Sequence, residues 1–263
     1  MDANPIKAKI DQLIDNLCQL TDSAKITETF KAYMDSISRF YHYSYFNSML
    51  IILTKPDATR VAGFHAWHKF NRFVRKGEHG IPILAPIIIK PKDQPEDQAR
   101  LVGFKTAYVF DVSQTDGEPL PEAPEWRSPG KLESLHAKLL DFAASKDITV
   151  TVESLKNGAM GYSAGGKIVL DVTAGTKTLV HEIAHELLHK RNPIDSTRQR
   201  KEVEAESVAF VVCSFFGMPD LASPNYLALW EADPKVIKAS LAAIQTTARL
   251  IIDYCNPNPT PEE

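Results

Sequence analysis

Two histidines four residues apart, His181 and His185, with Glu182 directly after the first, carry the clearest chemical signal in the chain. On an α-helix, residues four apart lie on one face, roughly 6 Å apart along the axis, so both imidazoles can reach one metal ion. Glu182 lies next to them, where its carboxylate can act as a general base toward a water at the metal. The pattern is typical of zinc hydrolases, and it predicts one zinc ion (Zn2+) per chain with Glu182 as the catalytic residue.

A catalytic zinc needs a third protein ligand and an open position for water. His189 lies eight residues after His181, roughly 12 Å along a continuous helix, which is too far for a shared ion. The acidic run that follows offers Glu202, Glu204 and Glu206 on the next expected helix. The spacing of Glu202 and Glu206 resembles the gluzincin Glu-x-x-x-Asp element, in which the first acid binds metal and the second orients a histidine. The resemblance implies Glu202 as ligand and Glu206 behind a histidine, with Glu204 as the alternative ligand.

The composition is that of an ordinary soluble protein, with 44% hydrophobic and 24% charged residues among 263. No apolar run approaches the ~20 residues of a membrane span, and the N-terminus lacks the features of a secretory signal. Three cysteines form no disulfide framework. These features predict a cytoplasmic protein that does not associate with membranes.

Hydrophobic periodicity predicts an α+β fold of two domains. Residues 1–115 hold helices over 5–20, 23–39, 41–53 and 63–70, followed by a small sheet of strands over 81–89 and 101–110. The segment 116–130 is rich in proline and predicts a linker. Residues 131–263 contain helices over 132–145 and 235–254 and strands over 148–152 and 167–170. They also contain the expected helix of His181 and the expected helix of Glu202, Glu204 and Glu206.

The first domain combines positive charge with many aromatic residues. Within residues 54–92, eight lysines and arginines face only Asp57 and Glu78. Cations that follow the backbone, and rings on which bases stack, are how proteins hold single-stranded nucleic acid. The alternative is that the rings form the core and the cations a solvated surface.

Residues 45–51, 58–81 and 104–115 resemble the N-terminal single-stranded-DNA-binding domain of ArdC-type antirestriction proteins. Residues 148–230 resemble the zinc-peptidase domain of that family and of ImmA/IrrE-like peptidases. The resemblance therefore implies a single-stranded-DNA-binding domain tethered to a zincin-like, gluzincin-type metallopeptidase domain. The chain departs from the ArdC pattern in the residues after His185, where Glu186 stands.

Arg72, Arg75 and Lys76 lie beside Gly77, where the backbone can approach a phosphate closely, so we expect them to contact the DNA backbone. Tyr45 and Trp67 are candidate stacking platforms. The alternative for both rings is burial, which the apolar surroundings of Trp67 favour.

The sequence thus predicts a single-stranded-DNA-binding zinc metallopeptidase, and the resemblance implies that it protects the DNA of a mobile genetic element from restriction. One alternative is an ImmA/IrrE-like regulatory endopeptidase that cleaves a repressor or another protein partner. Another is a binding protein whose zinc is structural, which the presence of Glu182 disfavours. For a protein substrate, we expect pairing with an edge strand formed by residues 167–170.

Overall fold

The structure, a computed structural model, describes residues 23–89, 100–120, 129–156, 158–190, 197–218, 221 and 234–257. These residues form two compact units: unit 1 contains the described part of 46–120, and unit 2 contains 23–45 and the described part of 129–257. The predicted mixed α+β fold is confirmed. The helix expected over residues 5–20 lies outside the described residues. Among the helices that are described, none is long and apolar enough to cross a membrane.

Unit 1 is built on a three-stranded antiparallel sheet. Its strands follow the order β1 (Val61–Gly63), β4 (Arg100–Asp111) and β3 (Ile81–Ile89). Helix α3 (Tyr45–Thr54) is tied to β3 by Asn47, whose side chain donates to the carbonyl of Leu84 at 3.0 Å and accepts from its amide at 2.8 Å. An amide side chain can satisfy both backbone groups of one residue in this way, so Asn47 fixes the helix to the strand.

A second, two-stranded sheet in unit 1 pairs β2 (Arg72–Val74) with β5 (Thr115–Gly117). The short helix α4 (Phe64–His68) precedes β2, and the 3-10 turn η2 (Val112–Gln114) precedes β5. A small apolar cluster beneath them is centred on Trp67. The last two residues of β5, Asp116 and Gly117, lie in the segment expected to be a linker.

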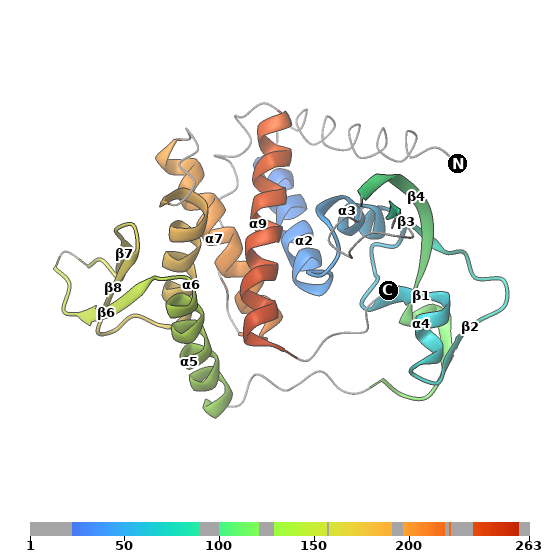
Figure 1. Cartoon of the computed structure of the whole chain (residues 1–263), viewed down its shortest axis with the longest axis horizontal. Coiled ribbons are helices and arrows are strands. Elements are labelled where there is room, and N and C mark those ends of the chain that lie inside the picture. The colour runs from blue at the N-terminus through green and yellow to red at the C-terminus, as the bar shows by residue number, and fades with distance from the viewer. Residues whose placement is uncertain are drawn as a thin grey trace. The chain divides into compact units, whose positions relative to one another are not determined.

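Unit 2 is a group of helices packed beside a small mixed sheet (Figure 1). The helices are α2 (Ser23–Arg39), α5 (Pro129–Ser145), α6 (Thr176–His185), α7 (Arg198–Phe215) and α9 (Pro234–Cys255). The sheet has the order β6 (Thr149–Glu153), β8 (Lys167–Asp171) and β7 (Gly161–Ser163), with β6 parallel and β7 antiparallel to β8. These elements match the predicted ones to within a few residues, except β7, which the sequence does not predict.

Helix α2 packs in unit 2, although the sequence groups it with the first domain. Its apolar face, with Met34 and Ile37 fully buried, lies against α7. The segment after it is fixed in the same unit, since the ring of Tyr41 packs on Phe215 of α7 at 4.7 Å between centroids. The carbonyl of Tyr43 accepts a hydrogen bond from Gln245 of α9. The boundaries at 115 and 130 stay predictions.

Candidate metal centre and nucleic-acid surface

Helix α6 presents His181 and His185 to one point because its other face is held in the core. Leu179, Val180 and Ile183 are fully buried, as the helical apolar pattern predicts. The two imidazoles are half-buried, and their Nε2 atoms lie 3.0 Å apart. The spacing of four residues therefore brings two potential ligand atoms together.

Glu202 of α7 completes a triangle of ligand atoms. Its Oε2 lies 3.5 Å from the Nε2 atom of His181 and 3.5 Å from that of His185. Bonds of ~2.0–2.1 Å at tetrahedral angles place the ligands of zinc ~3.3 Å apart, which the triangle matches. Glu202 is exposed, whereas His181 and His185 are half-buried. Within the described residues, these three form the cluster that could hold a divalent ion.

Glu206 lies behind His181, one turn along α7 from Glu202. Its Oε2 is 3.2 Å from Nδ1 of His181, and its other oxygen accepts from the Nζ atom of Lys177. Burial raises the pKa of Glu206, but the bonds from His181 and Lys177 outweigh it and lower the pKa below its ordinary value. The carboxylate thus accepts the Nδ1 proton of His181 and leaves Nε2 to face the cluster.

The two clustered imidazoles differ in proton affinity. Burial acts to lower the pKa of His181, but the Glu206 hydrogen bond and the nearby carboxylates raise it above its ordinary value. Burial and the charge of His181 lower the pKa of His185 to about 4. His181 therefore binds a proton more readily than His185, whose Nε2 atom lies 3.0 Å from that of His181.

Glu182 is buried beside the cluster, with its side chain against the backbone of β7. A Cβ atom at Gly161 would come within 3.2 Å of the Cγ atom of Glu182 and 3.3 Å of its Oε1 atom. Burial raises the pKa of Glu182, and His181 opposes that effect only partly. A carboxyl group with a raised pKa next to a potential metal site has the chemistry of a general base.

Glu186, the departure from the ArdC pattern, has a defined structural partner. Its fully buried carboxylate accepts from the amides of Gly165 at 2.8 Å and Gly166 at 2.7 Å. Both glycines have left-handed backbones, with φ of 76° and 87°, which glycine adopts without strain. Glu186 therefore fixes the turn between β7 and β8 to the C-terminal end of α6.

The expectation of an edge strand at residues 167–170 is wrong. Strand β8, which contains them, pairs with β6 on one side and with β7 on the other, so its backbone groups are used within the sheet. In the described part of the sheet the edges are β6 and β7, and β7 is the edge next to Glu182.

His189 and Glu204 form a contact that sequence reasoning missed. His189 lies in a π-helical turn, η3 (Glu186–Lys190), and its Nε2 is 2.9 Å from Oε2 of Glu204. Its Nδ1 is 3.1 Å from Nδ1 of His185. Glu202 therefore lies near the Nε2 atoms of His181 and His185, whereas Glu204 contacts that of His189. The four-residue spacing of His185 and His189 is the signal in the sequence that could have found this contact.

Both predicted stacking residues are buried, Trp67 in unit 1 and Tyr45 in unit 2. Trp67 is 2% exposed and donates its indole N–H to the carbonyl of Phe110 at 3.0 Å. Tyr45 is 5% exposed and packs edge-on against Tyr33. Neither ring offers a face to a base, so the assignment of stacking to Tyr45 and Trp67 is corrected.

Arg72, Arg75 and Lys76, the residues predicted to contact phosphate, differ in their exposure and in their contacts within the protein. Arg72 donates to the carbonyl of Thr115 at 2.9 Å and to its hydroxyl at 2.8 Å, so it holds β2 to β5. Arg75 is exposed but bonds Glu78 at 2.7 Å and the carbonyl of Ser113 at 2.6 Å. Lys76 is exposed at the tip of the same turn.

A different set of rings is exposed on unit 1. Phe64 is 44% exposed and Phe73 is 57% exposed, and the ring of His68 lies between them at 5.4 Å and 5.1 Å between centroids. His65 lies beside both Phe64 and His68, at 5.4 Å and 5.8 Å. We call these four residues the aromatic surface. The sequence did not reveal this surface, because exposed rings such as Phe64 and Phe73 stand within a few residues of the buried Trp67 and have no distinct spacing.

Comparisons with known proteins give weak structural likeness and one regional match. No curated protein matches the chain. The metal-free crystal structure of antirestriction ArdC protein from plasmid R388 aligns with 19% identity and a TM-score of 0.49, covering 83% of this chain and 87% of that chain. Its Mn(II)-bound structure aligns with 18% identity and a TM-score of 0.49, covering 86% and 99%. Residues 5–110 of this chain match the family model described as the N-terminal domain of anti-restriction factor ArdC.

Proposed function

We propose that this chain is an ArdC-like antirestriction protein that binds single-stranded DNA through unit 1 and hydrolyses peptide bonds at a zinc centre in unit 2. The match of residues 5–110 supports the antirestriction assignment. The triangle of His181, His185 and Glu202 with buried Glu182 beside it is the observation that carries the hydrolase assignment.

Zinc is the ion that this donor set favours. Two neutral imidazoles and one carboxylate, with separations close to those of a tetrahedral site, are the ligands of catalytic zinc. Manganese and iron also accept two histidines and a carboxylate, but they prefer sites with more oxygen ligands or octahedral geometry. A metal titration must therefore compare zinc with manganese.

The chain's own residues divide the reaction between them. An ion bound at the cluster would lower the pKa of a water and polarise the carbonyl of the peptide. Glu182 accepts the proton of the attacking water and then donates it to the nitrogen of the leaving amine. The raised pKa of Glu182 suits both transfers, because the group must hold the proton between them. Glu206 keeps Nε2 of His181 free to bind the ion.

Strand β7 is the proposed site of peptide binding. It is an edge of the described sheet, and Gly161 lies against Glu182. An extended peptide that pairs with this edge would run past the carboxylate and the cluster. The absence of a Cβ atom at Gly161 lets Glu182 lie close to the strand.

Single-stranded DNA is the proposed partner of the aromatic surface. Phe64 and Phe73 present exposed rings on which bases can stack, and Lys69 and Lys76 are exposed on the same short segment. Stacking tolerates any base, whereas the lysines neutralise phosphates, so the surface suits a strand of any sequence.

A regulatory peptidase is the second candidate function, favoured by the position of β7 at an edge of the described sheet, next to Glu182. In this reading, unit 1 locates DNA and unit 2 cleaves a repressor or another protein bound there. The two candidates differ in whether the protection of DNA requires the general base.

The test compares the wild type with Glu182→Gln and His185→Ala, with Glu133→Gln on an exposed face of α5 as the matched control. We expect Glu182→Gln to retain zinc and DNA binding but to lose peptide cleavage, and His185→Ala to lose zinc as well. Protection of DNA from a restriction enzyme that survives in Glu182→Gln would favour antirestriction by binding, and its loss would favour proteolysis. A zinc-loaded wild type that cleaves no member of a peptide library would refute the hydrolase half.

A further inference from the structure

Behind the second ligand histidine lies a chain of hydrogen bonds that ends at a buried carboxylate. It runs from His185 to His189 and on to Glu204, with the two steps spanning 3.1 Å and 2.9 Å. His189 and Glu204 are both buried. Three elements of unit 2 contribute to the chain: α6 with His185, η3 with His189 and α7 with Glu204.

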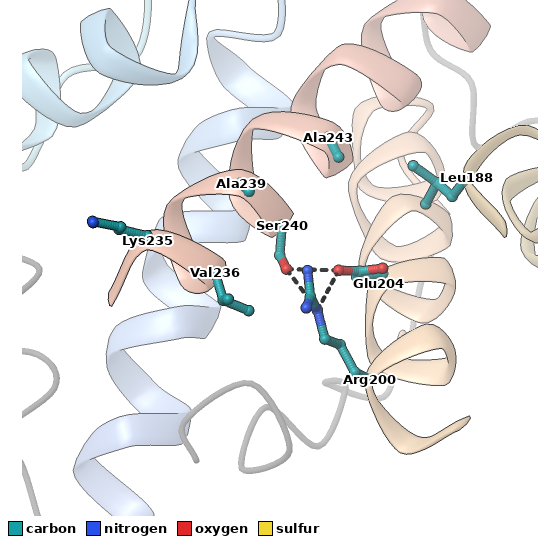
Figure 2. Close-up of a pocket in the computed structure, with 8 residues that line it drawn as sticks. All are labelled: Leu188, Arg200, Glu204, Lys235, Val236, Ala239, Ser240 and Ala243. Carbon is teal, nitrogen blue, oxygen red and sulfur yellow. Dashed lines mark hydrogen bonds and ion pairs between the residues drawn. The ribbon is translucent and has the colours of Figure 1, made fainter. Parts of the chain in front are cut away.

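The carboxylate of Glu204 is an acceptor for every neighbour that contacts it. Its Oε1 accepts from Ser240 Oγ at 2.6 Å and from Arg200 Nε at 2.9 Å, and its Oε2 accepts from His189. Figure 2 shows Arg200, Glu204 and Ser240 converging at the wall of a cavity of about 290 Å³. The guanidinium of Arg200 cannot accept a hydrogen bond, so Arg200 must be the donor and Glu204 the acceptor.

The order of donors and acceptors then follows along the chain. A neutral imidazole has a single N–H, and Glu204 requires that of His189 to be on Nε2. Nδ1 of His189 is therefore an acceptor, and its contact with Nδ1 of His185 requires His185 to donate. Nε2 of His185 is left with its lone pair toward His181 and Glu202.

We propose that His189 and Glu204 are positioning residues that set the tautomer of His185, so that Nε2 is free to bind the ion. The proposal rests on the proposed metal centre and adds a chain of two hydrogen bonds that orients His185. Glu206 sets the tautomer of His181 by direct contact, whereas Glu204 sets that of His185 through an intervening imidazole. This role explains why His189 is buried one helical turn beyond His185.

Glu204→Gln is the sharpest test, because it retains the shape of the side chain. Arg200 and Ser240 keep the amide oxygen on their side, so the amide N–H2 faces Nε2 of His189. His189 must then carry its proton on Nδ1 and donate to His185, whose own proton moves to Nε2, the atom that faces the cluster. Loss of an outer partner of a metal ligand typically weakens metal binding 10- to 100-fold, which is the weakening of zinc affinity that we expect.

Ser207→Ala is the matched control, since Ser207 is buried on the same helix and its hydroxyl donates to the carbonyl of Val203, away from the chain of bonds. Its zinc affinity should stay within about threefold of the wild type. Competition with a chelating dye measures the affinities, and nitrogen-15 NMR of labelled histidines in the metal-free protein reads the tautomers directly.

The expected spectra show the proton on Nε2 of His189 and on Nδ1 of His185 in the wild type, and the reverse in Glu204→Gln. A wild-type spectrum with the proton on Nδ1 of His189 would overturn the proposal, as would equal zinc affinity of Glu204→Gln and the wild type. The spectrum of the wild type decides the question even if the variant does not fold. A wild type that binds zinc but cleaves no peptide refutes the hydrolase proposal alone and leaves this test in force.

Discussion

Nδ1 of His181 lies 3.2 Å from Oε2 of Glu206, and this contact joins helix α6 to helix α7. The same carboxylate is bonded by Lys177 of α6, so one side chain of α7 is held at two points. The orientation of the first imidazole is therefore a property of the packing of two helices, and not of α6 alone.

Glu206→Gln should weaken zinc binding by about 10- to 100-fold. Lys177 donates to one oxygen of Glu206, so a glutamine would keep its carbonyl there and turn its amide toward His181. The N–H2 group would then oppose the Nδ1 proton of His181 and favour the wrong tautomer. Zinc competition with a chelating dye measures the change. Equal affinities of the variant and the wild type would show that Glu206 does not orient the ligand.

Zinc affinity should fall with decreasing pH, by about tenfold for each pH unit below the pKa of His181. The raised pKa of His181 means that its proton must be displaced at a higher pH than for an ordinary histidine. In Glu206→Gln the carboxylate that raises this pKa is gone, so the fall should begin at a lower pH than in the wild type. Zinc affinities of both proteins, measured from pH 5 to 8, check the shift. Coinciding pH profiles would contradict the assignment of the displaced proton to His181.

Glu182→Gln should stabilise the metal-free protein at neutral pH. A carboxyl group whose pKa is raised by folding binds its proton more readily in the native state, so the ionised form costs stability as the pH rises through that pKa. The variant should therefore melt roughly 2–4 °C higher at pH 7, the shift that ~1 kcal/mol produces in a protein of this size. The advantage should shrink toward pH 4, where the wild-type carboxyl group is protonated.

Exposed Glu133→Gln, which removes the same charge without relieving burial, should melt within a degree or so of the wild type. Thermal unfolding of the metal-free proteins, followed by circular dichroism at both pH values, measures the difference. A lower melting temperature of Glu182→Gln at pH 7 would mean that Glu182 has a stabilising partner, which conflicts with a poised base.

Much of the metal site could be predicted from the sequence because helix periodicity is local. His181 and His185 share a face by their spacing alone, and Glu202 and Glu206 do so on α7. Glu204 is two residues from each of these acids, so it lies on another side of the same helix. The inward stripe of α7, of which Ala205 and Val208 are fully buried, fixed which side faces α6.

The contacts that could not be predicted join residues that are far apart in the chain. The indole of Trp67 finds its acceptor 43 positions away, at Phe110, and the guanidinium of Arg72 finds Thr115 at the same separation. The sequence shows that a residue is aromatic or positively charged, but not whether its side chain will donate a hydrogen bond to a distant carbonyl. The position of β8 in the middle of its sheet likewise depends on β7, a strand of three residues that gives no periodic signal.

Glu186→Gln should destabilise unit 2, since its carboxylate is the acceptor for two backbone amides. Hydrogen bonds to a charged group contribute ~1.5–3 kcal/mol each, and a glutamine can accept from only one of the two glycines while its N–H2 opposes the other. We therefore expect a loss of about 2–3 kcal/mol in the free energy of unfolding, measured by urea denaturation. Glu153→Gln, at an exposed position of β6, should change the free energy of unfolding by less than about 0.5 kcal/mol. Equal effects of the two variants would show that the turn at Gly165 is held by something other than Glu186.

Phe73→Ala should lower the affinity for single-stranded DNA by roughly 5- to 150-fold, since a stacked base typically contributes ~1–3 kcal/mol. The ring is more exposed than that of Phe64 and lies 5.1 Å from His68, so its loss opens a gap in the surface without disturbing the core. Fluorescence anisotropy with a labelled oligonucleotide, at two salt concentrations, measures the change.

Phe104→Ala is the matched control for that measurement, because Phe104 is an exposed phenylalanine of the same unit. It lies on β4 five residues from Val109, the partner of Gly63, and so roughly 17 Å along the strand from the aromatic surface. Phe104→Ala should bind DNA with an affinity close to that of the wild type. The salt dependence separates the two kinds of contact, since removing a ring should leave its slope unchanged whereas Lys76→Ala should reduce it by about one. A larger loss in Phe104→Ala than in Phe73→Ala would move the binding face from α4 and β2 to the β3–β4 hairpin.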